Sequence, residues 1–562
     1  MTLGNFLIEQ LQKYGANHIF GLPGDYTLNF LNEVENNPNI TYVGVSREDS
    51  AGYAADAYAR MSGCGVACVT YSVGGMNVMN PIAAAFAERS PVVIIVGKPN
   101  LEDLEENPNK HHTIDNEHTQ KNIFDNVVCS SISLDAEDMI ENMRRINYAL
   151  QTMKYHSRPI YIEFSNKNII REITDNNLKA FAEFNSDIYG NDKIVLGTVS
   201  NLALIDKTFR NASNRVLILG HEIFRTSLEH SVLEFATKLN IPVFTTILGK
   251  STIDETNPIA MGAVSQLTSD PKITKAIGNS DCIITMGMSN TDVDGFTFIP
   301  HFSVNMSEGV SIGGEFPSAM TRFRDMVTEF CHHFEDVKPQ SEKTMEQWRD
   351  VACRKYKHKQ IPNILTLEYV FDKIGESIAP EYLMGQRCSE DEHIVISDIG
   401  ESLFGMIDVP VTHGQFLCMA YYTSMSFSIP AAVGVKFAKP AKRPIVIVGD
   451  GAFQMTGSEF SSHIRYGLNT IVIILNNKGY STERAIMDGK FNDIHNWHYE
   501  KITDLMNGGV GKYVNTPKGF SKIFNQALND KNQSYVLNVQ ILQSDMSPVM
   551  RSIAQKMCQE QL

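Results

Sequence analysis

The sequence predicts an α/β protein built from three doubly wound, parallel-sheet domains. Short apolar runs rich in β-branched residues recur along its 562 residues and alternate with helical stretches, which is typical of parallel βαβ units. The chain is also too long for one hydrophobic core, because domains usually hold roughly 150–200 residues. Two polar stretches, residues 166–193 and 332–363, interrupt the alternation and are expected to be linkers.

These breaks predict domains over residues 1–180, 190–340 and 360–562. Each domain contains apolar runs with the length of buried strands. In chain order, the expected strands cover residues 65–70, 91–97, 158–164, 215–220, 241–246, 281–287, 393–397, 444–449, 470–475 and 535–541. Residues 458–465 lie between two of these runs and are expected to form the crossover helix of a βαβ unit.

Composition narrows the class of protein. Asp and Glu number 64 against 49 Lys and Arg, and a net charge of −15 argues against nucleic-acid binding. The nine cysteines form no CxxC pair, which predicts reduced thiols and a cytoplasmic location. No apolar run reaches the roughly 18 residues of a membrane span, and the first residues lack the basic start of a signal peptide.

Two neighbouring strands end in residues suited to a cation. Gly449-Asp450-Gly451 closes one apolar run and Asn476-Asn477 closes the next. Because consecutive strands of a βαβ unit end at the same sheet edge, Asp450 and Asn477 can face one site, where their oxygens suit Mg²⁺. Gly451 allows a diphosphate to approach the backbone. An ordinary Asp-Gly turn and an unrelated Asn loop remain the alternative.

Three stretches of the first domain carry further reactive groups. Asp25 follows a Gly-Pro turn, Glu48 begins a helix of small residues, and His111 and His112 form a pair in a polar loop. Each has a structural alternative when taken alone. Asp25 could cap a helix, Glu48 could stabilise a helix N-terminus, and the histidines could be solvated.

Together these stretches resemble the thiamine diphosphate (ThDP) dependent 2-oxo acid decarboxylases, over nearly the whole chain. The His-His pair is the specific part, because it separates these decarboxylases from synthases and oxidases of the same fold. The matching motifs are G-D-Y at 24–26, E-x-x-A-G-Y-A-A-D-x-Y-A-R at 48–60, T-Y-S-V-G at 70–74, E-R-S-P-V-V at 88–93, GDG…NN, and the segments 479–483 and 491–497.

The resemblance implies pyrimidine-binding, middle and diphosphate-binding domains, the last with a C-terminal lid helix. It implies non-oxidative decarboxylation of 2-oxo acids to aldehydes through a ThDP carbanion and enamine, with Mg²⁺ as the second cofactor. It also implies a homodimer or a dimer of dimers, since the cofactor of this family lies between the first domain of one subunit and the last domain of another.

The family's cofactor contacts transfer to matching positions. By resemblance, Glu48 binds the aminopyrimidine ring nitrogen, the carbonyl of Thr423 accepts from the 4′-amino group, and Met425 props the bent cofactor. The family usually has Gly where this chain has Thr423. The remaining cofactor contacts implied are Thr70, Asp450, Gly451, Ala452 and Asn477, with Mg²⁺ held by Asp450, Asn477 and the carbonyl of Gly479.

Reactive and substrate-facing residues follow in the same way. Asp25, His111, His112 and Glu483 are the implied proton-handling groups, with Glu483 facing the substrate carboxylate. Ala452 replaces the Ser that is common after GDG. The implied substrate pocket is formed by Ile399, Leu403, Thr482, Ile486, Ile553 and Met557.

Specificity is the least determined property. Leu403 stands where bacterial pyruvate decarboxylases have Trp, so we expect a roomy apolar pocket and a preference for medium to large aliphatic or aromatic 2-oxo acids. A pyruvate decarboxylase and a carboligating synthase of the acetolactate type are the alternatives.

Overall fold

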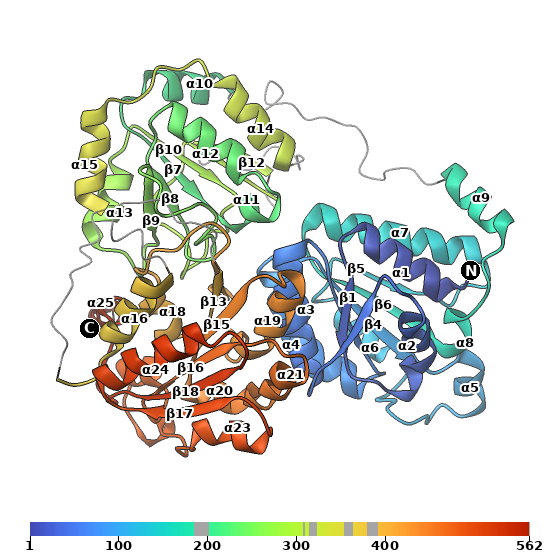
Figure 1. The fold of residues 1–562 in the computed structure, drawn as a ribbon. Coiled ribbons are helices and arrows are strands. Elements are labelled where there is room, and N and C mark those ends of the chain that lie inside the picture. The colour runs from blue at the N-terminus through green and yellow to red at the C-terminus, as the bar shows by residue number, and fades with distance from the viewer. Residues whose placement is uncertain (185–201, 307–308, 314–322, 353–362, 379–391, 561–562) are drawn as a thin grey trace. The chain divides into compact units, whose positions relative to one another are not determined.

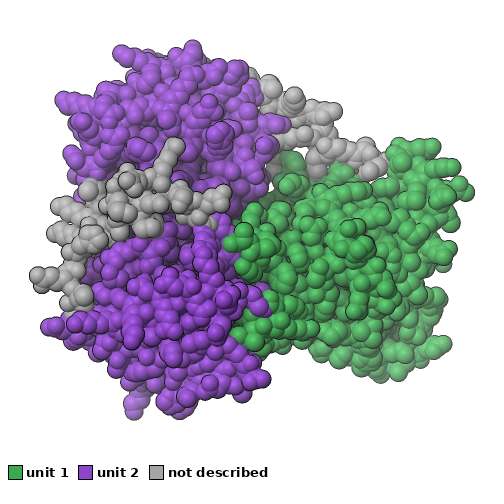
Figure 2. Space-filling view, in the orientation of Figure 1, with its two compact units in different colours: residues 1–192, 429–441, 456–466 green, residues 193–428, 442–455, 467–562 purple. Residues whose placement is uncertain are grey.

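The computed structural model describes residues 1–184, 202–306, 309–313, 323–352, 363–378 and 392–560. The chain divides into two compact units (Figure 2). The first holds residues 1–192, 429–441 and 456–466, and the second holds residues 193–428, 442–455 and 467–562. The first unit therefore adds two C-terminal segments to the first expected domain. None of the described helices is long and apolar enough to cross a membrane.

The first unit is built on a six-stranded parallel sheet of order β2-β1-β3-β4-β6-β5 (Figure 1). Its strands are β1 (His18–Gly21), β2 (Thr41–Gly44), β3 (Gly65–Val69), β4 (Val92–Lys98), β5 (Ser130–Ser133) and β6 (Ile160–Ser165). Its helices are α1 (Leu3–Lys13), α2 (Leu28–Glu35), α3 (Glu48–Ser62), α4 (Val73–Ala87), α5 (Leu101–Glu106), α6 (Thr119–Phe124), α7 (Met139–His156), α8 (Asn166–Ile169) and α9 (Asp175–Phe184), joined by α21 (Phe460–Arg465) and most of α19 (Ser428–Ala438).

The two faces of this sheet are covered differently. Large apolar side chains of α1, α2 and α7 pack on one face. Helix α3 lies so close to β3 that a Cβ on Gly65 would be 1.9 Å from the carbonyl oxygen of Ala55. The small residues of α3 permit this approach.

The second unit contains the two other sheets. The C-terminal sheet is parallel, with order β14-β13-β15-β16-β18-β17. Its strands are β13 (His393–Ser397), β14 (Phe416–Cys418), β15 (Arg443–Gly449), β16 (Ile471–Asn476), β17 (Val510–Val514) and β18 (Tyr535–Gln540). Its helices are α16 (Leu367–Ile378), α18 (Glu401–Met406), α20 (Asp450–Thr456), α22 (Ser481–Ile486), α23 (Ile502–Leu505), α24 (Pro517–Asn529) and α25 (Pro548–Glu560).

The middle sheet has the order β12-β11-β10-β7-β8-β9 and is parallel except for the edge pair β11–β12. The expectation of purely parallel sheets is corrected at that edge. Its strands are β7 (Arg215–Leu219), β8 (Val243–Thr245), β9 (Ala260–Ala263), β10 (Cys282–Met286), β11 (Phe302–Asn305) and β12 (Gly309–Ile312). Its helices are α10 (Leu202–Asn211), α11 (His221–Arg225), α12 (Glu229–Lys238), α13 (Pro271–Gly278), α14 (Phe323–His333) and α15 (Glu342–Ala352).

All ten expected strands are present, and β15 pairs in parallel with β16 through the expected crossover. Both expected linkers contain helices that pack on a core. Within 332–363, Met345 and Trp348 of α15 belong to the middle core, and within 166–193, Phe181 of α9 packs on the first core. In the sequence, the polar surface residues of these two helices made their apolar stripes hard to recognise.

Both the first and the C-terminal sheets reverse their strand order at a corresponding place, between β1 and β3 and between β13 and β15. Connections leave such a point on opposite sides, which opens a crevice beyond the carboxyl ends of the strands where ligands bind. The fold therefore indicates two possible ligand-binding places, one in each unit.

Candidate functional site

The crevice of the C-terminal sheet is formed around Asp450. This residue directly follows β15 and is 1% exposed. Its carboxylate accepts hydrogen bonds from the backbone N–H groups of Lys478 at 2.6 Å, Gly451 at 2.8 Å and Gly479 at 3.2 Å. Because Lys478 follows Asn477 at the end of β16, the predicted convergence of these two strand ends is confirmed.

The donor atoms at this convergence fit a hard cation. Burial raises the pKa of Asp450 to about 6, although the three amides oppose the shift. The side-chain oxygen of Asn477 is buried and has no hydrogen-bond partner. A buried carboxylate next to an unpartnered amide oxygen is the chemistry that Mg²⁺ satisfies, because it takes oxygen ligands and compensates the desolvated charge.

The chain beside Asp450 has no room for larger side chains. A Cβ on Gly451 would lie 2.5 Å from Cε1 of Tyr480. Ala452, the next residue, is buried at 6% exposure. A Cβ on Gly479 would lie 2.2 Å from the carbonyl oxygen of Asn492. The backbone itself therefore forms the surface beside Asp450, as a diphosphate-binding loop requires.

Asp398 is a residue of this crevice that sequence reasoning missed. It follows β13 and is 1% exposed. Its carboxylate accepts hydrogen bonds from the Ser426 N–H at 3.0 Å, the Ser428 N–H at 3.1 Å and the Ser428 hydroxyl at 2.8 Å. It thereby holds the segment that carries Thr423 and Met425. An acid directly after a buried strand, as at Asp450, was the available signal.

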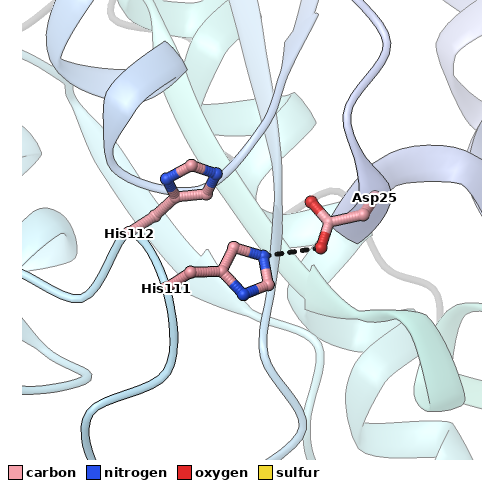
Figure 3. Close-up of side chains that lie close together, drawn as sticks. All are labelled: Asp25, His111 and His112. Carbon is pink, nitrogen blue, oxygen red and sulfur yellow. Dashed lines mark hydrogen bonds and ion pairs between the residues drawn. The ribbon is translucent and has the colours of Figure 1, made fainter.

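In the first unit three reactive side chains lie close together (Figure 3). Nε2 of His111 lies 2.7 Å from Oδ2 of Asp25, and the ring of His112 lies 4.8 Å from that of His111. One ligand atom from each of the three residues lies within 4.8 Å of the others. Sequence reasoning selected all three, and the structure brings them together.

Tyr26 fixes the orientation of His111. The two rings stack at 4.8 Å, and the Tyr26 hydroxyl lies 3.3 Å from Nδ1 of His111. Burial, followed by the nearby charge of Asp25, raises the pKa of Tyr26 to about 12, so its hydroxyl stays protonated at neutral pH.

Glu48 and Thr70 lie in the same unit. Glu48 begins α3 and accepts a hydrogen bond from the Asn77 amide at 2.6 Å. The Thr70 hydroxyl is buried without a hydrogen-bond partner. A Cβ on Gly24 would lie 2.4 Å from Cβ of Thr70, and one on Gly74 would lie 3.6 Å from Cγ of Glu48. Thr70 therefore lies between the turn that precedes Asp25 and the start of the helix that follows Ser72.

The buried amide of Gln120 supports this arrangement and was also missed. Its oxygen accepts the Ser72 N–H at 2.7 Å, and its nitrogen donates to the Tyr161 hydroxyl at 2.7 Å. Ser72 has a φ of 50°, so the loop after β3 is held in a strained conformation by a residue 48 positions away.

The expected substrate-pocket residues lie on three helices of the second unit, except Ile399, which lies in the bend between β13 and α18. Helices α18 and α22 both pack against α25. Leu403 is 1% exposed and shares a core cluster with Ile553, so neither side chain faces an open space in the described part of this unit. Ile399, Thr482 and Ile486 are half-buried and Glu483 is exposed. The Met557 side chain lies outside the described residues.

Comparison with known proteins matches three family models in chain order. Residues 1–123 match "Thiamine pyrophosphate enzyme, N-terminal TPP binding domain", residues 204–313 match its "central domain", and residues 398–539 match its "C-terminal TPP binding domain". Together these models cover more than half of the chain.

Curated relatives match over nearly the full length. The chain is 27% identical to a protein named indole-3-pyruvate decarboxylase from Azospirillum brasilense, over 99% of this chain and 98% of that protein. It is 28% identical to pyruvate decarboxylase 3 from Arabidopsis thaliana, over 94% and 88% of the two chains. It is also 28% identical to an alpha-keto-acid decarboxylase from Mycobacterium tuberculosis, over 90% and 88%.

Proposed function

Because this chain belongs to the thiamine pyrophosphate enzyme family, we propose that it decarboxylates 2-oxo acids without oxidation, releasing CO₂ and an aldehyde. The grouping of Asp25, His111 and His112 in one crevice carries this proposal. Decarboxylation replaces a carboxylate with a proton, and such a cluster can hold and move that proton. The relatives' names, which all contain decarboxylase, support it.

In this proposal the cofactor is held by both crevices. Asp450, Asn477 and the carbonyl of Gly479 would hold Mg²⁺, and the backbone of Gly451 and Ala452 would hold the diphosphate. Glu48, with Thr70, would bind the aminopyrimidine ring, and Thr423 and Met425 of the C-terminal domain would also hold the ring system. When bound, ThDP supplies the electron sink for the electron pair that remains after CO₂ leaves.

The proton-handling groups then complete the reaction. The bond between the carbonyl carbon and the carboxylate breaks, and a proton is added to that carbon before the aldehyde departs. The hydrogen bond between Asp25 and His111 joins an acid to an imidazole, the pairing that general acid catalysis near neutrality uses. Glu483, exposed on α22, faces the substrate carboxylate in this proposal.

We further propose that medium to large aliphatic or aromatic 2-oxo acids are preferred over pyruvate. Two points support this preference: by the resemblance, Leu403 stands where bacterial pyruvate decarboxylases have Trp, and one full-length relative is named for indole-3-pyruvate. The six free cysteines among the described residues fit the proposed cytoplasmic location.

The proposed active unit is a homodimer, alone or paired into a tetramer, with each cofactor between two copies. Both units have exposed apolar side chains close in sequence to their proposed reactive residues. In the first unit these are Val73 and Ile114, and in the second Met487 and Phe491, all more than half exposed. Burial of these side chains between two copies would be favourable, which supports the proposed dimer.

The test is aldehyde release from pyruvate, 2-oxoisovalerate, 2-oxooctanoate, phenylpyruvate and indolepyruvate, with ThDP and Mg²⁺ supplied or removed. We expect cofactor-dependent aldehyde formation, with kcat/KM rising with side-chain size. A maximum at pyruvate would reject the substrate preference and keep the reaction. Acetolactate in place of aldehyde would assign the chain to the carboligating synthases.

A further inference from the structure

We propose that Asp25, His111 and His112 form a binding site for Zn²⁺, and that occupation of this site inhibits the enzyme. One ligand atom from each side chain lies within 4.8 Å of the others, and no second such group of His, Cys, Asp or Glu occurs among the described residues. The binding half of this proposal stands on the cluster alone, and the inhibition half rests on the proposed function.

The donor set selects the kind of metal. Two imidazole nitrogens and one carboxylate oxygen suit Zn²⁺, whereas Mg²⁺ prefers oxygen ligands. The expected Mg²⁺ site offers only oxygens, from Asp450, Asn477 and Gly479. The two cations therefore belong to different crevices, and an excess of Mg²⁺ should not empty the histidine site.

The three ligand atoms lie close enough together for small movements to form a tetrahedral site. Zinc bonds of about 2.0–2.1 Å place ligand atoms roughly 3.3 Å apart. The Asp25–His111 pair is already at 2.7 Å, in a hydrogen bond whose proton a metal would replace. The side chains of His111 and Asp25 are 55% and 52% exposed, so small rotations can close the remaining distance. The fourth position stays open for water or substrate.

The surroundings hold the ligands in place. Metal-binding histidines commonly use their second ring nitrogen in a hydrogen bond that fixes the ring. In this protein the Tyr26 hydroxyl lies 3.3 Å from Nδ1 of His111, so the nitrogen left to bind the metal is Nε2, which is hydrogen-bonded to Asp25. The Asp25 carbonyl accepts from the Asn166 amide at 2.8 Å, which anchors the backbone of the third ligand.

Occupation of the site would remove the groups that move protons in the proposed reaction. A metal holds each imidazole in its neutral form through the nitrogen that would otherwise exchange a proton. Zn²⁺ should therefore inhibit turnover without displacing ThDP or Mg²⁺.

The experiment measures Zn²⁺ affinity of the enzyme loaded with ThDP and Mg²⁺, by competition with a chromophoric zinc chelator. We expect one site per chain, weakened at least tenfold in Asp25→Asn and in His112→Ala. Tyr26→Phe keeps the stacked ring and removes the hydroxyl, and should weaken binding by about tenfold. Equal affinity in the parent and His112→Ala would overturn the proposal.

The matched control is the other histidine pair on α14. His332 pairs with Glu335 at 3.1 Å and His333 pairs with Asp206 at 2.9 Å. Each of these two histidines therefore contacts a different acid. The double change His332→Ala and His333→Ala should leave zinc affinity and turnover unchanged. A loss of zinc affinity in this variant would assign the binding to surface histidines and reject the site.

The inhibition arm follows aldehyde release with Mg²⁺ in excess and Zn²⁺ added at the measured affinity. Restoration of turnover by a zinc-selective chelator is the expected result. Bound zinc with full turnover would overturn the regulatory half. Zinc bound as expected by a chain that releases aldehyde from no 2-oxo acid would reject the proposed function and keep the metal site.

Discussion

At the residue scale, Glu401 is a buried acid whose role depends on a distant segment. It lies on α18 at 5% exposure, and both carboxylate oxygens are 3.2 Å from the backbone nitrogen of Ser547, just before α25. Burial raises its pKa to about 7, and the nearby Asp545 adds to the shift while Ser547 and Arg551 oppose it. Glu401 therefore links the start of the C-terminal helix α25 to α18.

The raised pKa makes stability depend on pH. Between about pH 4.5 and 7 the folded protein keeps a proton that the unfolded chain has released, so stability falls as the pH rises through this window. Glu401→Gln keeps an acceptor for the Ser547 N–H without the charge, and should be more stable at pH 8 by on the order of 3 kcal/mol.

The measurement is the thermal midpoint of Glu401→Gln and the parent at several pH values from 5 to 8.5. The difference should grow with pH and then level off above pH 7.5. The exposed Glu234→Gln on α12 serves as the control and should follow the parent. A difference that is the same at every pH would contradict the assignment.

Thr423, which stands where the family usually has Gly, has a strained backbone conformation. Its φ is 52°, in the left-handed region that β-branched residues rarely adopt. The family's usual Gly at this position has no such penalty. Thr423→Gly should stabilise the protein by about 1 kcal/mol, after the entropy lost with glycine is deducted.

Thermal unfolding of Thr423→Gly and Thr423→Ala tests this prediction. Alanine keeps the Cβ that causes the strain, so it should gain much less than glycine. Equal midpoints for the two variants would show that the backbone at 423 relaxes without cost.

At the element scale, two helices from the C-terminal part of the sequence help to build the first unit. In the segment before α21, Glu459 accepts hydrogen bonds from the Ser46 N–H at 3.0 Å and the Ser46 hydroxyl at 2.5 Å. The Tyr466 hydroxyl donates to the Gly44 carbonyl at 3.0 Å. These contacts hold the loop that leads into α3, and therefore position Glu48.

Helix α19 approaches α3 at a glycine. A Cβ on Gly434 would lie 2.0 Å from the carbonyl oxygen of Ala54, and backbone atoms cannot move aside as a flexible side chain can. Gly434→Ala should therefore cost about 1–3 kcal/mol of stability. It should also weaken ThDP binding, because α3 carries Glu48.

Thermal unfolding and ThDP titration of Gly434→Ala check this prediction. Gly278→Ala at the end of α13 is the matched control, because a Cβ there meets nothing within 4 Å. The control should keep the parent's ThDP affinity. Parent-like stability of Gly434→Ala would mean that the two helices lie further apart.

At the scale of the whole molecule, the first and C-terminal sheets share one strand order and carry their crevices at equivalent places. One crevice holds Glu48 and the histidine cluster, and the other holds Asp450 and Asn477. If the proposed dimer combines the first domain of one copy with the last domain of another, each site needs both chains.

Complementation tests this arrangement directly. Glu48→Gln and Asp450→Asn should each be inactive as homodimers. A heterodimer of the two, isolated with separate affinity tags, should recover about half of the parent's activity, because one of its two sites combines only unchanged residues. No recovery in the heterodimer would place both halves of each site in the same chain.

The sequence by itself determined ten of the eighteen strands among the described residues, and the meeting of Asp450 with the segment after Asn477. A local apolar run is enough to predict a buried strand, and the parallel strands of one βαβ unit must end at the same edge of the sheet. It also selected Asp25, His111 and His112, although only through their resemblance to a family motif.

Only the tertiary structure decided which distant residues hold those groups in place. Asp398 reaches Ser428, Gln120 reaches Ser72, and Glu401 reaches Ser547 across 30 to 146 positions. The same holds for the apolar stripes of α9 and α15, which polar neighbours concealed. Such partners give no periodic signal in the local sequence, because folding brings them together through the packing of whole elements.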